Sequence, residues 1–121
     1  MVKPTGPTNP YLKELIEKLK EISFKRNAKI WRRIAELLGR PRRKRIEVNL
    51  SRIERYCKPN ETIVVPGVVL ASGNLTKPLK IAAWRFSERA KEKILKAKGE
   101  IMEIEELIEK NPRGSGVRII C

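Results

Sequence analysis

A run of basic side chains occupies residues 40–45, where five of the six residues are Arg or Lys. Guanidinium groups bind phosphates through two parallel hydrogen bonds, and cations at this density release the counterions condensed on a nucleic acid. A lone basic hexamer could equally be a solvated charge run or a localisation signal. Basic residues continue on both sides of this one, however, at Arg26, Lys29, Arg32, Arg33, Arg52 and Arg55. The pattern therefore favours a phosphate-binding surface attached to a folded body.

The charge of the whole chain indicates the same chemistry. The 121 residues include 28 Lys and Arg but only 14 acidic residues, which gives a net charge of +14 and a pI near 10.2. Residues 25–58 hold thirteen of the basic residues and three Glu, so most of the excess charge is in this segment. A pI above about 9 favours a polyanionic partner, and nucleic acid is the commonest one.

The composition argues against an enzyme. The chain has no His and no Asp, so it cannot form a Ser-His-Asp or Cys-His site, nor most zinc sites. Cys57 and Cys121 lie far apart and lack the spacing of a metal or redox motif. An acidic cluster at residues 103–109 could hold Mg²⁺ for a nuclease, but the apolar residues between its Glu side chains favour a solvated helix face. We therefore expect no catalysis, no cofactor and no metal.

The elements that would position the basic residues follow from periodicity and from helix caps. Apolar residues at helical spacing predict a helix that begins at Pro10 and a second one between Asn27 and Gly39, where Gly39 would take the left-handed conformation past the helix end. A short helix is predicted over residues 51–57. Later segments predict strands at 62–65, 68–70, 79–84, 100–104 and 117–120, a turn at Pro66-Gly67, and helices at 88–98 and 105–110.

These elements predict a mixed α/β fold of one domain. Residues 59–121 would form a compact β/α body, residues 9–58 a basic helical half, and residues 1–8 a flexible tail. Val48, Leu50 and Ile53 would attach the basic run to the core. No apolar stretch in the sequence is long enough to predict a membrane span or a secretion signal.

Four aromatic residues and one glycine-rich segment allow two interpretations each. Trp31, Trp84, Tyr56 and Phe86 could stack on bases. Their apolar neighbours favour a place in the core, least clearly for Tyr56.

The segment NPRGSGVRII, residues 111–120, could present backbone amides to a phosphate or could be a simple turn. Arg113, Ser115 and Arg118 within it form a weaker second candidate patch.

Six segments between about Asn9 and Ile120 resemble segments of a known protein family and follow one another in the same order as in that family. They are NPYLKELI, AKIWRRIAELL, PRRKRIEVNLSRIERYCK, VVPGVVLASGNL, IAAWRFSERAKEKI and EELIEKNPRGSGVRII. They are similar to the archaeal large-subunit ribosomal proteins of the L-eighteen-e family, which are related to the bacterial L-fifteen proteins. The combination of VNLSRI and NPRGSGVRI is the most specific part. Cys57 and Cys121 have no role that the resemblance explains.

The resemblance implies a non-enzymatic, cytoplasmic component of the ribosome that binds and stabilises the large-subunit ribosomal RNA. Neighbouring ribosomal proteins would be its other partners, with no membrane and no small-molecule substrate. A DNA-compacting chromatin protein is the alternative, since it would share the charge and the lack of catalytic residues. The residues expected to contact RNA are Arg26, Lys29, Arg32, Arg33, Arg40, Arg42, Arg43, Lys44, Arg45, Asn49, Arg52 and Arg55, followed by Arg113, Ser115 and Arg118.

Overall fold

The computed structural model describes residues 10–39 and 46–121. The predicted tail at residues 1–8 and the basic run at residues 40–45 lie outside the described residues. The elements are, in chain order, α1 (Pro10–Arg26), α2 (Lys29–Leu38), β1 (Ile46–Asn49), α3 (Leu50–Tyr56), β2 (Thr62–Leu70), β3 (Lys80–Phe86), α4 (Glu88–Lys96), β4 (Glu100–Glu103), α5 (Ile104–Lys110) and β5 (Val117–Ile119). The mixed α/β fold class is confirmed.

The strands form one parallel sheet around β2. β3 pairs with one side of β2, and β4 pairs with β3 at the edge of the sheet. The other side of β2 is shared by two short strands placed end to end, because β5 pairs with Thr62–Val64 and β1 pairs with Gly67–Leu70. Segments separated by about seventy residues in the sequence therefore meet on one strand.

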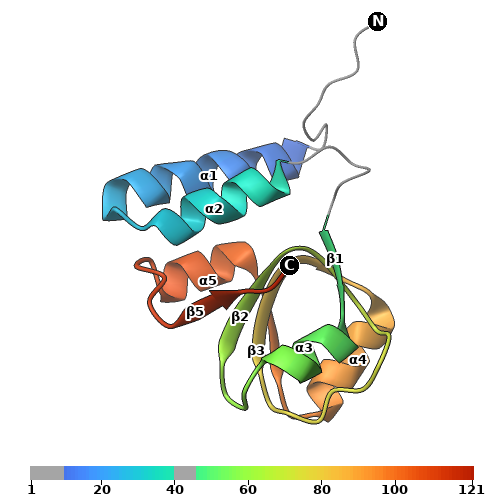
Figure 1. Cartoon of the computed structure of the whole chain (residues 1–121). Coiled ribbons are helices and arrows are strands. Elements are labelled where there is room, and N and C mark those ends of the chain that lie inside the picture. The colour runs from blue at the N-terminus through green and yellow to red at the C-terminus, as the bar shows by residue number, and fades with distance from the viewer. Residues whose placement is uncertain (1–9, 40–45) are drawn as a thin grey trace, which may run out of the picture.

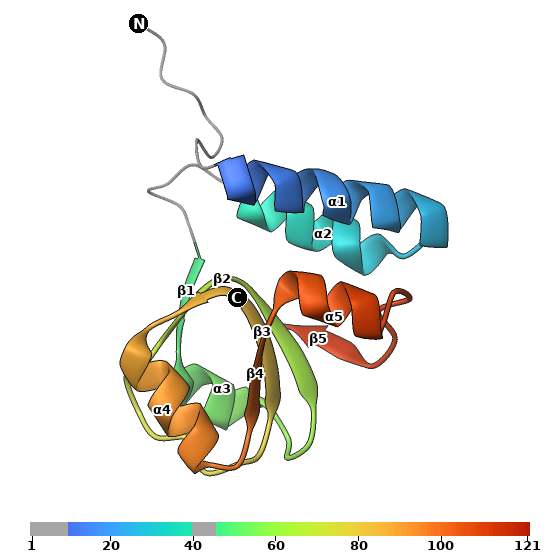
Figure 2. The same cartoon turned by 180° about the vertical axis from the view of Figure 1, so that it is seen from behind.

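Helices cover both faces of the sheet, as Figures 1 and 2 show from opposite sides. α1 and α2 form a helical hairpin that lies, together with α5, on one face, where Val64, Ala82 and Met102 of the strands contact them. α3 and α4 pack on the other face against Ile63 and Ile81 and their neighbours. The alternation of side chains along each strand thus supplies two separate apolar clusters.

Local sequence signals explain several of the helix ends. Ser87 precedes α4 and its hydroxyl accepts a hydrogen bond from the backbone N–H of Ala90 at 3.2 Å. Glu103 and Glu106 form a reciprocal capping box at the start of α5. The predicted left-handed conformation of Gly39 is wrong, because its φ is −78°. α4 ends at Lys96, before the predicted boundary, and Lys98 has the positive φ of 66° there.

β2 differs most from what its sequence predicts. The turn predicted at Pro66-Gly67 is a continuation of the strand, which runs unbroken from Thr62 to Leu70. Its pairing with β3 shifts register between Val65 and Val68, so the two residues form an irregularity in the ladder. Proline, which lacks an N–H, is tolerated at such a site. β1 is a strand that the sequence pattern did not predict, although Val48, Leu50 and Ile53 are buried in the core as expected.

Gly67 allows β1 to lie against β2. A Cβ atom at this position would be 2.1 Å from the carbonyl oxygen of Ile46. We expect Gly67→Ala to lower the free energy of unfolding by about 2 kcal/mol, because the backbone of β1 must move to relieve the clash. Denaturant unfolding followed by circular dichroism would measure this change.

Gly39→Ala is the matched control. Gly39 has a helical φ, and a Cβ there would come no closer than 3.4 Å to another atom, so its free energy of unfolding should change by less than about 0.5 kcal/mol. Equal stability of the two variants would contradict the steric role that we assign to Gly67.

Candidate nucleic-acid interface

α2 separates its cations from its apolar residues. Trp31, Ile34 and Leu38 are buried against α1 and the sheet. Lys29, Arg32 and Arg33 are exposed on the other side of the helix, and Arg26 is exposed in the last turn of α1. Helical periodicity therefore places these four cations on the outer side of the helical hairpin. We call Arg26, Lys29, Arg32 and Arg33 the hairpin surface.

The hairpin surface keeps most of its positive charge. Arg32 and Arg33 both approach Glu36, with nitrogen–oxygen distances of 3.6 Å. The three side chains are more than half exposed, and ion pairs of this kind contribute little to stability in water. Two guanidinium groups share a single carboxylate, so a net positive charge is left to interact with a phosphate.

The loop that follows α5 is fixed against α2. The indole N–H of Trp31 donates a hydrogen bond to the carbonyl of Pro112 at 2.7 Å. Gly114 is buried with a φ of 68°, and a Cβ there would lie 2.4 Å from a side-chain carbon of Ile30. The exposed side chains of Arg113 and Ser115 are therefore held next to the hairpin by the buried face of α2.

This loop resembles a turn more than a phosphate-binding nest at Gly114. The backbone N–H of Gly114 already donates to the carbonyl of Asn111 at 3.0 Å. The side-chain amide of Asn111 donates to the carbonyl of Ser115 at 2.8 Å. The N–H of Gly114 is therefore used within the loop, whereas the side chains of Arg113 and Ser115 are exposed to a ligand.

α3 carries cations on the opposite face of the sheet. Leu50 and Ile53 are buried, and Arg52 and Arg55 are exposed. Asn49 occupies the N-cap position, but its half-buried side chain makes no capping hydrogen bond. The structure therefore places these residues on a rigid helix, away from the hairpin surface.

Arg118 belongs with α3 and not with Arg113. Its guanidinium donates to the carbonyl of Tyr56 at 2.7 Å and lies 3.6 Å from Glu61, so it joins β5 to the end of α3. The guanidinium of Arg52 lies 5.3 Å from the centre of the Tyr56 ring. We call Arg52, Arg55 and Arg118 the α3 surface. The predicted second patch is thus divided between the two surfaces.

The four ambiguous aromatic residues differ in burial. Trp31 is fully buried, which confirms its place in the core. Trp84 and Phe86 are half-buried, and Tyr56 is 48% exposed. Tyr56 is therefore accessible in the α3 surface, whereas the core interpretation holds only in part for Trp84 and Phe86.

The buried cysteine has no reactive role in this arrangement. Cys57 is buried at the end of α3, and burial raises the pKa of its thiol above the ordinary value. A raised pKa favours the uncharged thiol, which behaves as a small apolar side chain. Cys121 is exposed beside the α3 surface.

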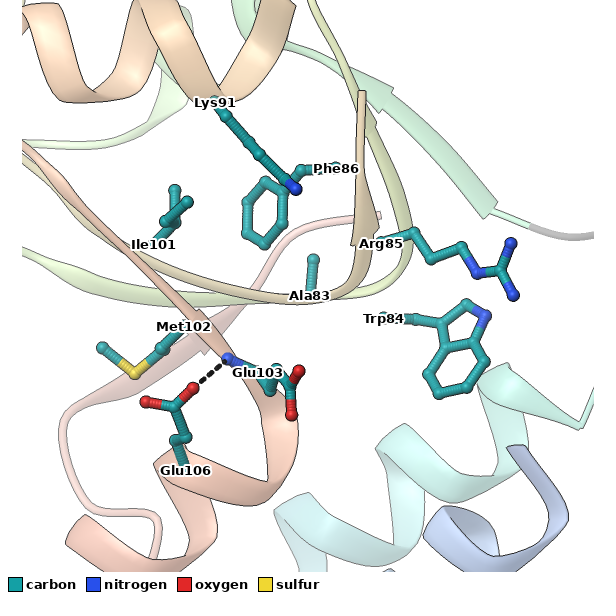
Figure 3. A pocket seen from close by; sticks show the side chains of 9 residues that line it. All are labelled: Ala83, Trp84, Arg85, Phe86, Lys91, Ile101, Met102, Glu103 and Glu106. Carbon is teal, nitrogen blue, oxygen red and sulfur yellow. Dashed lines mark hydrogen bonds between the residues drawn. The ribbon is translucent and has the colours of Figure 1, made fainter. Parts of the chain in front are cut away.

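Glu103 and Glu106 of the acidic cluster line the pocket shown in Figure 3, which lies at the carboxyl ends of β3 and β4. The backbone N–H of Glu103 donates to the carboxylate of Glu106 at 3.3 Å, so both side chains act in the capping box of α5. Lys91 extends into the pocket from α4, and Arg85 and Trp84 lie at its other end. Within residues 10–39 and 46–121, no group of three or more acidic, His or Cys side chains could hold a metal ion.

Sequence reasoning missed two exposed features. Phe24 is 89% exposed near the end of α1 and is followed in sequence by Lys25 and Arg26. Arg85 lies 5.5 Å above the ring of Trp84 on β3. The helical period of α1 places Phe24 opposite the buried stripe, which is a signal that was present in the sequence.

Comparison with known proteins identifies the family. The family model described as "Ribosomal protein 60S L18 and 50S L18e" matches residues 2–121. The chain belongs to this family. Its members are structural ribosomal proteins and not enzymes, which confirms both the resemblance and the expectation of a non-catalytic chain.

Three curated relatives carry the name "Large ribosomal subunit protein eL18". The protein of Archaeoglobus fulgidus is 54% identical over 113 residues, which cover 93% of this chain and 97% of the relative. That of Methanoregula boonei is 52% identical and covers 99% of both chains. The relative from Methanopyrus kandleri is 49% identical over 97% of this chain and 96% of its own length. The similarity therefore spans nearly the full length on both sides.

None of the helices in the described part of the chain is long and apolar enough to cross a membrane.

Polar contacts fix α3 to the rest of the body. The ammonium of Lys77 donates to the carbonyls of Glu54 and Cys57 at 2.6 and 2.8 Å, which caps the end of α3. The carboxylate of Glu54 accepts hydrogen bonds from the backbone N–H and the hydroxyl of Thr76.

The hydrogen bonds from Thr76 lower the pKa of Glu54 below its ordinary value. A lowered folded-state pKa stabilises the fold above the unfolded-state pKa, and this contribution is lost as the pH falls through the folded-state value. We expect Glu54→Gln to be less stable than the wild type at pH 7, by at most about 1 kcal/mol. The difference should begin to shrink as the pH falls below the ordinary glutamate pKa, and it should disappear below the lowered folded-state pKa. Thermal unfolding over a series of pH values would measure it.

Glu92→Gln is the control, because Glu92 is exposed on α4 and makes no ion pair among the described residues. Its stability should follow the wild type at every pH. A Glu54→Gln variant that also follows the wild type would contradict the anchoring role of this carboxylate.

Proposed function

We propose that the chain is a structural constituent of the large ribosomal subunit that binds folded large-subunit ribosomal RNA and stabilises it, in the cytoplasm and beside neighbouring ribosomal proteins. The observation that carries the proposal is the pair of exposed cationic surfaces, held by helices on opposite faces of one rigid sheet. The basic run at residues 40–45 joins them in the sequence. Membership of a ribosomal protein family supports the choice of RNA.

The two surfaces suit a folded RNA better than an isolated strand. Cations fixed on helices bind phosphates and sugars without losing much conformational freedom, and such contacts position a protein without selecting a base sequence. Two separate surfaces would bind RNA segments that only the folded molecule brings together. Specificity would then come from the shape of the RNA.

The proposed contacts are of three kinds. The first kind comprises the hairpin surface, the α3 surface and Asn49. The second kind comprises Arg113 and Ser115 in the loop next to α2. The third kind is the basic run at residues 40–45, which lies outside the described residues. In full, the proposed residues are Arg26, Lys29, Arg32, Arg33, Arg40, Arg42, Arg43, Lys44, Arg45, Asn49, Arg52, Arg55, Arg113, Ser115 and Arg118.

Sedimentation tests the proposal. Native lysate would be separated on a sucrose gradient before and after a high-salt wash, and the chain followed by immunoblot. We expect it to remain with the large subunit at high salt, whereas basic proteins that bind only through charge are released. Release into the light fractions, or migration with DNA, would contradict the proposal and favour the chromatin alternative.

Single cations in the proposed interface should each contribute to the salt dependence of RNA binding. Arg55→Ala and Arg43→Ala should each weaken binding and reduce the slope of log affinity against log salt by about one unit. Arg55 is exposed and its side chain forms no ion pair within the described residues, so its loss should not affect the fold. Filter binding to large-subunit ribosomal RNA at several salt concentrations would measure the slope.

Arg89→Ala provides the comparison for this measurement. Arg89 is exposed on α4 and lies outside the proposed contacts, so the slope should stay at the wild-type value. An unchanged slope for Arg55→Ala would remove Arg55 from the interface.

A further inference from the structure

Phe24 has the largest exposed fraction among the large hydrophobic side chains of the described residues, at 89%. The buried stripe of α1 consists of Leu12, Leu15, Ile16 and Leu19, and the helical period places Phe24 on the opposite side. Neither the fold nor the hydrophobic core therefore requires an aromatic side chain at this position. A single exposed apolar side chain is common on protein surfaces, so the surroundings of this ring decide whether it has a partner.

The ring lines an open groove of about 750 Å³ between α1 and α2. The groove exists because the chain reverses sharply after α1, where Asn27 has a φ of 51° and the backbone N–H of Ala28 donates to the carbonyl of Ser23 at 3.1 Å. Asparagine tolerates this left-handed conformation better than most residues. Side chains that line the groove with Phe24 include Lys20, Asn27, Lys29, Arg32 and Glu36.

The groove is positively charged around the aromatic ring. Lys20 and Lys29 make no ion pair within the described residues. Glu36 is the one acidic residue in the lining, and it already interacts with Arg32 and Arg33. Outside the groove, Glu21 is paired with Lys25 at 2.8 Å, and this contact lowers the pKa of Glu21.

We propose that Phe24 stacks on an unpaired base of the ribosomal RNA, with the flanking phosphates against Lys20, Lys29 and Arg32. This inference rests on the proposed binding of ribosomal RNA and adds a contact to the base itself. A nucleotide combines a flat π surface with an adjacent negative charge, and this combination matches an aromatic ring in a cationic groove. Such stacking tolerates any base, because every base has a π face.

Four variants test the inference, with a transcript of the large-subunit ribosomal RNA of Archaeoglobus fulgidus as the probe. We expect Phe24→Ala and Phe24→Leu to weaken binding by about tenfold or more, because neither side chain can stack on a base. Phe24→Tyr should bind like the wild type. Leu95→Ala is the control for loss of an exposed apolar side chain, since Leu95 is 56% exposed on α4, and it should have no effect.

The salt dependence separates stacking from charge. Phe24→Ala should reduce affinity at every salt concentration and leave the slope unchanged, whereas Lys20→Ala should reduce the slope by about one unit. A Phe24→Trp variant gives an independent signal, because stacking on a base should quench its added indole fluorescence beyond the change seen in the wild type. Circular dichroism would verify that all variants are folded.

Each outcome decides between the possibilities. Wild-type affinity in Phe24→Ala or Phe24→Leu would overturn the stacking inference and leave the RNA-binding function in place. Full affinity in Phe24→Leu with weakened binding in Phe24→Ala would show that an apolar contact with the RNA suffices, which would also overturn stacking. Full affinity in both variants is the result expected if Phe24 docks on a protein. A wild-type chain that fails to bind the transcript would overturn both proposals together.

Discussion

The close approach of β1 to β2 at Gly67 is the constraint on which the placement of α3 and its cations depends. With no side chain at Gly67, the carbonyl of Ile46 can lie against the backbone of β2, and four consecutive residues of β1 are then in register. This register determines where the chain leaves the strand at Asn49 and begins α3 at Leu50. The absence of a side chain at Gly67 therefore contributes to where α3, with Arg52 and Arg55, begins on the body. β1 also fixes the point at which residues 40–45 join the body.

The contacts around α3 keep this geometry rigid. The backbone N–H of Ser51 donates to the carbonyl of Ser72, and Gly73 lies so close to Ser51 that a side chain there would clash. Lys77 caps the other end of the helix and Arg118 joins it to β5. Both ends of α3 are therefore fixed by residues distant in sequence. A helix of only seven residues would not be stable alone, so these tertiary contacts are what allow it to present cations in a defined arrangement.

The sequence predicted what depends on local patterns and missed what depends on distant contacts. The helices and the exposed basic residues of α2 follow from periodicity, and the Ser87 cap follows from a known preference. The irregularity at Pro66-Gly67 resembles a turn in sequence, and only pairing with β3 and β1 makes it part of a strand. For the same reason, no local signal could show that Arg118 joins Tyr56 or that the cations divide between two faces of the sheet. The exposure of Phe24, in contrast, could have been predicted from the sequence, because helical periodicity places it away from the buried stripe of α1.

The distribution of charge restricts how this body can approach a polyanion. β4 forms one edge of the sheet, and Glu100, Glu103 and Glu105 are exposed on it and on the first turn of α5. β1 and β5 form the other edge, where α3 and Arg118 place their cations. A body with acidic and basic edges has a preferred orientation in the field of an RNA before any contact is made. We expect the edge formed by β4 to be directed away from phosphates. The exposed glutamates of β4 and α5 and the cations of α3 and β5 thus lie at different edges of one sheet, because the strand order places β4 and β5 on opposite sides of it.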